Sequence, residues 1–396
     1  MIYNVKVQDN QFTAKGFLVW GICILFCLYA FLLHTSIGTF QHSIMQDLNL
    51  TSAFEFSLLS STVFVLMYGV MQIPVGLVVD KIGLKNSLLI GAAACAIAKI
   101  GFACSYSYPL AIFFRMLMGF GSAFGFICLV IAVYDWMPHR YAAIFIGISQ
   151  FFVTLGPMLA GGPLNAIAQT WGVDWRFIFL GLGGVGILAT VLIYLFVEGN
   201  CGKVGEGVFL HRHENISASI KQLFSKIQPW YIAMLSACVY FSVEYFSANE
   251  GRAFLALKGV SLRSASYMIT VGWIGHAIGC PLLGFISDFI KRRKIVMILS
   301  AFLGLVAILM ILYTFDERYL LWGFFLLGLS ASGQSVGFAL MGEQFAKRFV
   351  AIGFGLNNAM ITAVAAINAP VIGRLLDHTR AGVTASLDEY ISVTIP

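Results

Sequence analysis

Eleven long apolar segments are the feature that most limits how this 396-residue chain can fold. A helix needs about 20 mostly apolar residues to cross about 30 Å of hydrocarbon, whereas strands of a membrane barrel alternate apolar and polar residues over about ten positions. The segments are long and uninterrupted, so we expect an all-α membrane protein. The predicted spans are 17–39, 55–79, 86–105, 109–135, 142–168, 175–197, 230–256, 265–289, 295–314, 320–342 and 350–376.

Charge supports a membrane location and predicts an orientation. Only 11% of the residues are charged, against about 25% in soluble domains. With the amino terminus in the cytoplasm, 15 Lys and Arg residues fall on the cytoplasmic side and seven on the opposite side. Cytoplasmic loops of membrane proteins carry the excess of basic residues. We therefore expect a multi-pass plasma (inner) membrane protein with a cytoplasmic N-terminus.

The rest of the composition argues against other classes of protein. The basic residues are scattered between apolar runs, which is not typical of nucleic-acid binding. The eight cysteines include no C-x-x-C pair, and six of them lie inside apolar segments, where cysteine acts as a small apolar residue. The sequence predicts no metal site and no cofactor.

One long polar connection divides the chain into two comparable parts. The expected organisation is a cytoplasmic tail, a bundle of six helices, a cytoplasmic loop, a second bundle of which five helices are seen, and a polar C-terminal segment. These parts correspond to residues 1–16, 17–197, 198–229, 230–379 and 380–396.

The two parts carry related motifs at a constant separation. Gly76 and Asp80 follow the second span, and Gly284 and Asp288 follow the eighth span 208 residues later. The same separation places Gln150 of span five over Asn358 of span eleven. An internal repeat of six-helix units with a pseudo-two-fold relation explains this pattern.

The motif Gly76-Leu-Val-Val-Asp80-Lys81-Ile-Gly83-Leu-Lys85 resembles the turn between spans two and three of the major facilitator superfamily of secondary transporters. Arg115-Met-Leu-Met-Gly119-Phe-Gly121 resembles the family's span-four segment, and the Gly/Pro-rich stretch around Pro157 resembles one often associated with antiporters. The resemblance covers about residues 15–380. It implies two six-helix bundles, and because only a short polar segment follows span eleven, we expect the twelfth helix to be missing from this chain.

Ionisable groups inside spans are the first candidates for function, because a charge at the bilayer centre costs at least about 2.5–3.5 kcal/mol. Glu244 lies near the middle of span seven and is the leading candidate proton carrier, although a structural hydrogen bond is an equal alternative. Arg115 in span four is a candidate for binding an anionic solute or for setting the proton affinity. His34 and His276 are further candidates for proton exchange or for interhelical hydrogen bonds.

Neutral polar residues in the expected cavity-lining spans complete the candidate site. Amides and hydroxyls in these spans serve either cavity lining or interhelical hydrogen bonding. Lys99, by contrast, lies in a span that the resemblance places at the periphery, and we expect its ammonium to reach the outer interface. The neutral candidates for solute binding are Tyr240, Gln150, Gln334, Asn357 and Asn358.

The resemblance also implies a cytoplasmic gate in the turns of the repeated motif. Asp80 can cap a neighbouring helix and pair with Arg140 after span four, and the glycines permit a tight connection. The alternative is simple topology control by positive charge. The predicted gate comprises Gly76, Asp80, Lys81, Gly83, Lys85 and Arg140, together with Gly284, Asp288 and Arg292.

These features predict a monomeric, proton-coupled transporter of a small polar or anionic organic solute that works by alternating access. Polar residues in the presumed cavity favour uptake. A proton/solute antiporter that exports drugs or metabolites is an alternative, and a nontransporting receptor or truncated, inactive chain is an alternative of another class. A membrane enzyme is disfavoured, because the sequence lacks convergent catalytic groups near one interface.

Overall fold

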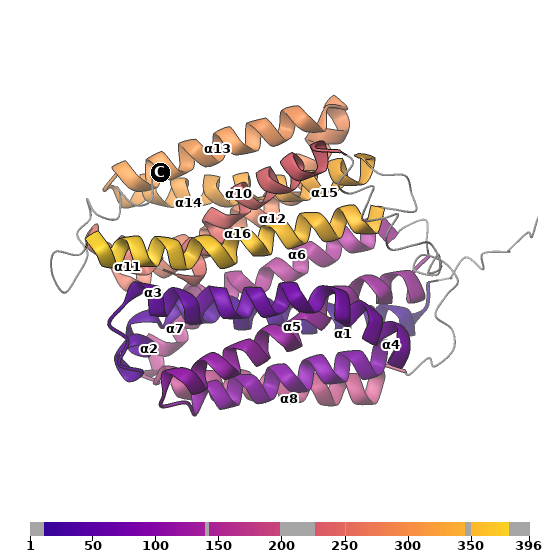
Figure 1. Ribbon diagram of the computed structural model, residues 1–396, viewed down its shortest axis with the longest axis horizontal. Helices are drawn as coiled ribbons and strands as arrows, with labels where there is room; N and C mark the ends of the chain where they lie inside the picture. Colours follow the sequence, from indigo (N-terminus) through magenta and orange to yellow (C-terminus); the bar gives the residue numbers. More distant parts are fainter. Residues whose placement is uncertain (1–11, 139–141, 199–225, 250, 345–349, 380–396) are drawn as a thin grey trace, which may run out of the picture.

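A computed structural model describes residues 12–138, 142–198, 226–249, 251–344 and 350–379 (Figure 1). Within this part of the chain, eleven helices are long and apolar enough to cross a membrane, in agreement with the predicted all-α membrane fold. The elements are α1 (Ala14–Thr39), α2 (Gln41–Asp47), α3 (Ala53–Ser57), the π-helical turn η1 (Leu58–Thr62), α4 (Val63–Ala103), α5 (Tyr108–Trp136), α6 (Ala142–Ala160), α7 (Gly162–Trp171), α8 (Trp175–Phe196), α10 (Gln228–Ala248), α11 (Gly251–Leu257), α12 (Leu262–Ile290), α13 (Arg293–Tyr313), α14 (Glu317–Ala331), α15 (Gly333–Gln344) and α16 (Val350–Thr379).

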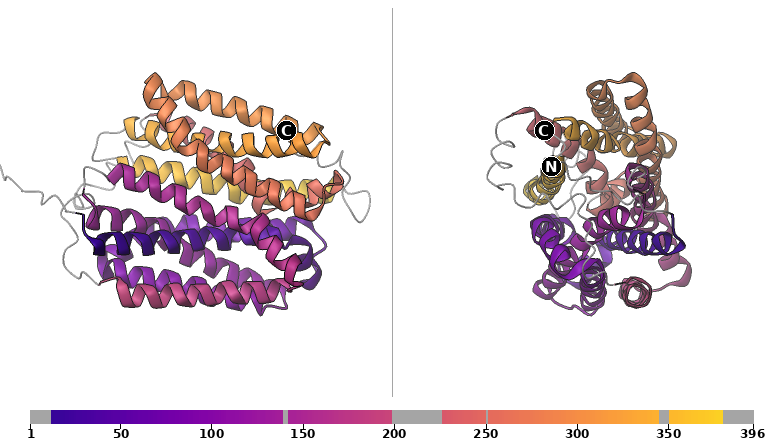
Figure 2. Two further views of the ribbon diagram at one scale, coloured as in Figure 1. Left: turned by 180° about the vertical axis from the view of Figure 1, so that it is seen from behind. Right: turned by 90° about the vertical axis from the view of Figure 1, so that its right-hand side faces the viewer.

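The helices form two bundles that lie side by side with their long helices roughly aligned. The indigo-to-pink helices up to α8 form one bundle and the red-to-yellow helices from α10 onward form the other (Figures 1 and 2). Helix α1 runs from Ala14 to Thr39, and we use these residues to name the two ends of the molecule. The Ala14 side also carries the end of α8, and the Thr39 side carries the end of α10 and the start of α12.

The helices repeat at close to the separation expected from the motifs. Helix α5 begins at Tyr108 and α14 begins at Glu317, 209 residues later. The break between α6 and α7 near Gly161 corresponds to Asn368–Pro370 inside the continuous α16. This correspondence of helix positions supports the predicted pseudo-two-fold repeat.

The turn between the second and third spans depends on Gly83. This residue has φ 82° and ψ 169° inside the long element α4, where it separates two helical stretches. Only glycine adopts this region readily, because it has no Cβ. The equivalent residue of the second bundle is Lys291, which has φ 55° and ends α12 in the left-handed region. The second turn therefore keeps a positive φ although its sequence has no glycine there.

The two turns predict different responses to alanine. Gly83→Ala should lower the free energy of unfolding by about 1–3 kcal/mol, because a side chain is strained in that backbone region. Lys291→Ala should change it by less than about 1 kcal/mol, because lysine and alanine pay a similar penalty for the left-handed region. Thermal unfolding in detergent, followed with a thiol-reactive dye that reports exposure of the buried cysteines, measures both. Equal losses in the two variants would contradict this account of the turns.

Candidate functional site

Hydrogen bonds between the two bundles close the Thr39 side. The Arg252 guanidinium of α11 donates to the Thr39 hydroxyl of α1 at 2.9 Å. The Gly162 backbone N–H at the start of α7 donates to the Thr270 hydroxyl of α12 at 2.7 Å. Close packing accompanies these bonds, because a Cβ on Gly38 of α1 would lie 2.3 Å from the Ser247 carbonyl oxygen of α10.

A carboxylate at the end of α16 also joins the bundles on this side. Asp377 accepts hydrogen bonds from the backbone N–H groups of Ala53 at 2.8 Å and Phe54 at 3.0 Å, and from the Ser52 hydroxyl. These are the free N–H groups at the start of α3, where a negative charge also interacts favourably with the helix dipole. The last turn of one bundle therefore caps a helix of the other.

The Ala14 side shows no comparable closure in the described part of the chain. Between described residues, several hydrogen bonds that join the two bundles lie in the half of the molecule nearer Thr39, and a side-chain hydrogen bond between Tyr68 and Asn358 joins them further toward the Ala14 side. At Gly76 and Gly284, the repeated glycines of the motif, an added Cβ would meet no other heavy atom within 4 Å. In the described part of the chain, these two glycines therefore make no close contact between the bundles.

Only part of the predicted gate lies among the described residues. Lys81 and Arg292 are exposed, and the Lys85 ammonium lies 5.1 Å from the centre of the Tyr194 ring of α8. Arg140 and the side chains of Asp80 and Asp288 lie outside the described part. The pairing of Asp80 with Arg140 stays a prediction.

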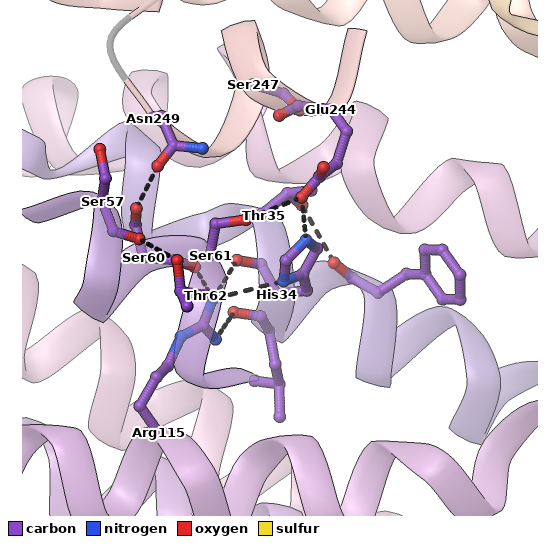
Figure 3. Close-up of polar contacts among 12 residues, drawn as sticks. His34, Thr35, Ser57, Ser60, Ser61, Thr62, Arg115, Glu244, Ser247 and Asn249 are labelled. Carbon is purple, nitrogen blue, oxygen red and sulfur yellow. Dashed lines mark hydrogen bonds and ion pairs between the residues drawn. The ribbon is translucent and has the colours of Figure 1, made fainter. Parts of the chain in front are cut away.

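Arg115 of α5 is fully buried and uses all three nitrogen atoms of its guanidinium (Figure 3). Its Nε donates to the Leu59 carbonyl at 3.1 Å, and its terminal nitrogens donate to the carbonyls of Leu33, His34 and Ser60. Leu59 and Ser60 belong to η1, and a π-helical turn leaves backbone carbonyls available for such contacts. The Arg115 charge is thus held by backbone oxygens of two neighbouring helices.

His34 connects Arg115 to Glu244 of the other bundle. An Arg115 terminal nitrogen lies 3.3 Å from His34 Nδ1, and His34 Nε2 lies 3.0 Å from Glu244 Oε1. Because a guanidinium has no acceptor, Nδ1 must accept and the ring proton must sit on Nε2, from where it is donated to the carboxylate. Phe64 holds the assembly in place, since the His34 ring stacks on it at 4.4 Å and the guanidinium carbon lies 4.5 Å from its centre.

Only one of the two oxygens of the Glu244 carboxylate has hydrogen-bond partners among the described residues. Its Oε1 also accepts a hydrogen bond from the Ser61 hydroxyl at 3.2 Å. Its Oε2 is buried and has no hydrogen-bond partner among the described residues. Glu244 reaches from α10 toward His34, with Arg115 on the far side of the imidazole (Figure 3). The free oxygen is the atom at which a proton can be taken up without displacing His34 or Ser61.

Sequence reasoning missed the serine contributions to this network. Besides Ser61, the Ser60 hydroxyl donates to Asn249 Oδ1 just beyond α10. Both serines lie in the run Ser60-Ser61-Thr62 within the second span, and Thr62 donates to the Ala366 carbonyl of α16 at 3.1 Å. Three consecutive hydroxyl residues in an apolar segment were the available signal.

A cavity lies between the bundles. It is closer to the molecular centre than the seam, as we call the hydrogen-bonded contacts between the bundles on the Thr39 side. Its volume open to the centres of water molecules is about 80 Å³. Residues from α1, α4, α5 and α6 of one bundle and from α10, α12, α15 and α16 of the other line it. The lining residues are Phe31, Tyr68, Phe126, Gln150, Val153, Thr154, Pro157, Tyr240, Trp273, His276, Cys280, Gln334, Ser335, Phe338 and Asn358.

Three pairs of lining residues occupy equivalent positions in the repeat. Members of each pair are 208 residues apart, so the two bundles present matched helix positions to the same cavity, as expected of a solute site on a pseudo-two-fold axis. The pairs are Tyr68 with His276, Phe126 with Gln334, and Gln150 with Asn358.

The structure separates the predicted substrate-binding or coupling residues into two groups. Gln150, Tyr240, His276, Gln334 and Asn358 line the cavity. Arg115, His34 and Glu244 form the network at the seam and are absent from the lining.

Asn357 belongs to neither group. It is fully buried, and neither side-chain atom of its amide has a hydrogen-bond partner among the described residues.

The expectation that Lys99 reaches the outer interface is wrong. The side chain is fully buried, its ammonium donates to the Ser36 hydroxyl of α1 at 2.9 Å, and it lies 3.2 Å from the centre of the Phe179 ring. Helix α8 covers this face of α4, so no path leads straight outward. The residue faces α1 and α8 because of the rotation of α4 about its axis, which the apolar pattern of this span does not reveal.

Known proteins resemble this chain over most of its length. Residues 21–367 match the family model described as Major Facilitator Superfamily. The chain is 23% identical over 255 residues to the hexuronate transporter of Bacillus subtilis (strain 168), a match that covers 63% of this chain and 59% of that protein. It is 24% identical over 306 residues to the 3-(3-hydroxy-phenyl)propionate transporter of Escherichia coli (strain K12), covering 76% and 73% respectively.

A solved structure shares the fold. It is the structure of a bacterial homologue of the human lysosomal transporter Spinster in an inward-facing and unoccupied conformation. The TM-score is 0.77, with 18% sequence identity, over 93% of this chain and 84% of that one. At this identity the likeness concerns the fold alone.

The two buried cations of the first bundle should differ in their effect on stability. Arg115→Met should lower the free energy of unfolding by about 3–5 kcal/mol, because it leaves buried carbonyls and His34 Nδ1 without their donor and removes the positive charge that offsets the buried Glu244 carboxylate. Lys99→Met should cause no loss, and a gain of up to about 1 kcal/mol, because an apolar side chain of similar length replaces a buried charge that has one hydrogen bond. Thermal unfolding in detergent compares them. A loss with Lys99→Met as large as that with Arg115→Met would contradict this.

Proposed function

The chain belongs to the Major Facilitator Superfamily of membrane transporters, and we propose that it is a proton-coupled secondary transporter that takes up a small polar or anionic organic solute by alternating access. The family is not enzymatic, which sets the membrane-enzyme alternative aside. We further propose that one chain is the working unit, because both bundles that line the cavity come from the same chain.

We propose that the Ala14 side is cytoplasmic and that the protein resides in a plasma membrane. The excess of basic residues, 15 against seven, supports this orientation. With it, the closed Thr39 side faces outward and the Ala14 side faces inward. The described conformation then corresponds to an inward-facing state in which the solute site is reached from the cytoplasm.

The observation that carries the coupling proposal is the Glu244 carboxylate shared between the bundles. While ionised, it accepts hydrogen bonds from His34 and Ser61 and offsets the Arg115 charge, so it favours a closed Thr39 side. Protonation at Oε2 removes the negative charge and weakens both contacts. The protonated protein therefore opens outward, binds solute, and releases the proton after closure.

Two helices connect this carboxylate to the solute cavity. Helix α10 carries Tyr240 in the cavity and Glu244 one turn further on, and α1 carries Phe31 in the cavity and His34 one turn further on. Residues three or four apart share a helix face. A solute that moves α1 relative to α10 therefore acts directly on the His34–Glu244 contact, which is the link that coupling requires.

The Gly/Pro-rich segment of α6 offers little support for the antiporter alternative. A Cβ on Gly156 would lie 2.4 Å from the Leu28 carbonyl oxygen of α1, so this glycine serves close packing of α6 on α1. The polar cavity supports uptake. The hexuronate and hydroxyphenylpropionate transporters that the chain resembles are named for small organic acids.

Replacement of Glu244 tests the coupling. In proteoliposomes with an acidic exterior, one pH unit should drive about tenfold accumulation of a solute that enters with one proton, because about 1.4 kcal/mol is a factor of ten. Labelled D-glucose, D-glucuronate and uridine serve as probes. Glu244→Gln should abolish accumulation of the transported probe while solute exchange without a gradient persists, because the amide fixes the protonated form.

Glu317→Gln, an exposed carboxyl at the start of α14, is the control and should accumulate solute like the wild type. Accumulation by Glu244→Gln equal to that of the wild type would refute the coupling role. Binding of a probe without any flux in the wild type would favour the nontransporting alternative.

A further inference from the structure

The cavity between the bundles has walls that match an uncharged solute. We propose that it binds an uncharged ring compound with several hydroxyl groups, such as a monosaccharide or a nucleoside, in preference to an organic acid. The proposal rests on the transport function and narrows its solute class. It is argued from the charge, the hydrogen-bonding groups and the size of the cavity.

Charge is the first argument. None of the described residues that line the cavity is Asp, Glu, Lys or Arg. The buried cations nearby are engaged elsewhere: Arg115 with backbone carbonyls and His34, and Arg252 with Thr39, Ser266 and the Ser247 carbonyl. A carboxylate transferred from water into such a cavity would lose its hydration without gaining a counter-charge.

His276 does not supply the missing charge. Its surroundings are the Cys280 sulfur at 3.7 Å from Nε2 and the rings of Trp273 and Tyr240, with centres at 5.6 and 5.7 Å. Among the described residues, no carboxylate contacts this ring. An imidazole ring can form hydrogen bonds with an uncharged hydroxyl group.

The other walls suit the faces and edges of a hydroxylated ring. Gln150, Gln334 and Asn358 contribute carboxamides, each with a donor and an acceptor that match the dual character of a hydroxyl. Phe31 and Phe126 add flat apolar surfaces, as do the other aromatic rings of the lining. A purely apolar drug would leave the carboxamides unpaired, and a charged solute would find no counter-charge.

The size of the cavity fits one small ring compound. About 80 Å³ is open to the centres of water molecules, and each water needs about 10–15 Å³ of such space and fills about 30 Å³ of liquid. The cavity therefore replaces about five to eight waters, or about 150–240 Å³ of liquid. A peptide or an oligosaccharide exceeds this volume.

Matched pairs of compounds that differ in charge test the proposal. Equilibrium binding to the purified full chain in detergent is measured by calorimetry for D-glucose against D-glucuronate and for uridine against uridine 5′-monophosphate. We expect an uncharged member to bind at least tenfold more tightly than its charged partner, and the pair that responds distinguishes a sugar from a nucleoside. Tighter or equal binding of the charged members, or no binding of either uncharged compound, would overturn the proposal.

Substitution of two glutamines of α15 tests whether the solute binds in this cavity. Gln334→Leu should weaken binding of the uncharged compound at least tenfold. Gln344→Leu, at the end of the same helix and outside the cavity lining, should change it less than twofold. Unchanged binding in Gln334→Leu, with thermal unfolding like that of the wild type, would place the site elsewhere.

Failure of this inference differs from failure of the coupling proposal. The binding measurement uses no gradient, so it does not depend on Glu244 as a proton carrier. If glucose or uridine binds but its uptake ignores the pH gradient, the coupling proposal fails and the solute class stands. If glucuronate alone binds and accumulates with protons, the solute class fails and the coupling proposal stands.

Discussion

The buried contact between Arg115, His34 and Glu244 is the interaction on which the rest of the structure depends. A charge placed within a membrane costs at least about 2.5–3.5 kcal/mol unless it is compensated. Here the cation of one bundle is compensated by backbone carbonyls and, through the imidazole, by the carboxylate of the other bundle. The closed Thr39 side is thus held by groups that cannot separate without exchanging partners, and we propose that its stability depends on the charge of Glu244.

The cavity and the seam are structurally connected because they share two helices. Phe31 and Tyr240 line the cavity, and one turn away on the same two helices His34 and Glu244 meet. The Asp377 cap on α3 and the Arg252–Thr39 bond close the same side at points outside the cavity lining. Closure is therefore distributed over several contacts, and we propose that the His34–Glu244 contact responds to both proton and solute.

The sequence was sufficient for the fold and for the choice of helices, and insufficient for the faces of those helices. Apolar length and the 208-residue repeat predicted the eleven spans, and five of the predicted polar residues line the cavity. The position of Lys99 was predicted wrongly, and the role of Arg115 was left open. All sides of these spans are apolar, so periodicity does not give the rotation of the helix about its axis. The π-helical turn η1, whose carbonyls bind Arg115, and the left-handed Lys291 have no sequence signal of comparable strength.

Distances across the Thr39 side at two pH values test the central claim most directly. Spin labels are attached at Ser43→Cys and Arg263→Cys, which are exposed positions of the two bundles, in a protein whose Cys104, Cys201 and Cys238 are replaced by Ser. The distance between the labels is measured by pulsed electron–electron double resonance. If the charge of Glu244 controls closure, the short distance should dominate at pH 8, a longer one should grow at pH 5, and Glu244→Gln should show the longer one at both. A distribution that changes with neither pH nor this substitution would contradict the account.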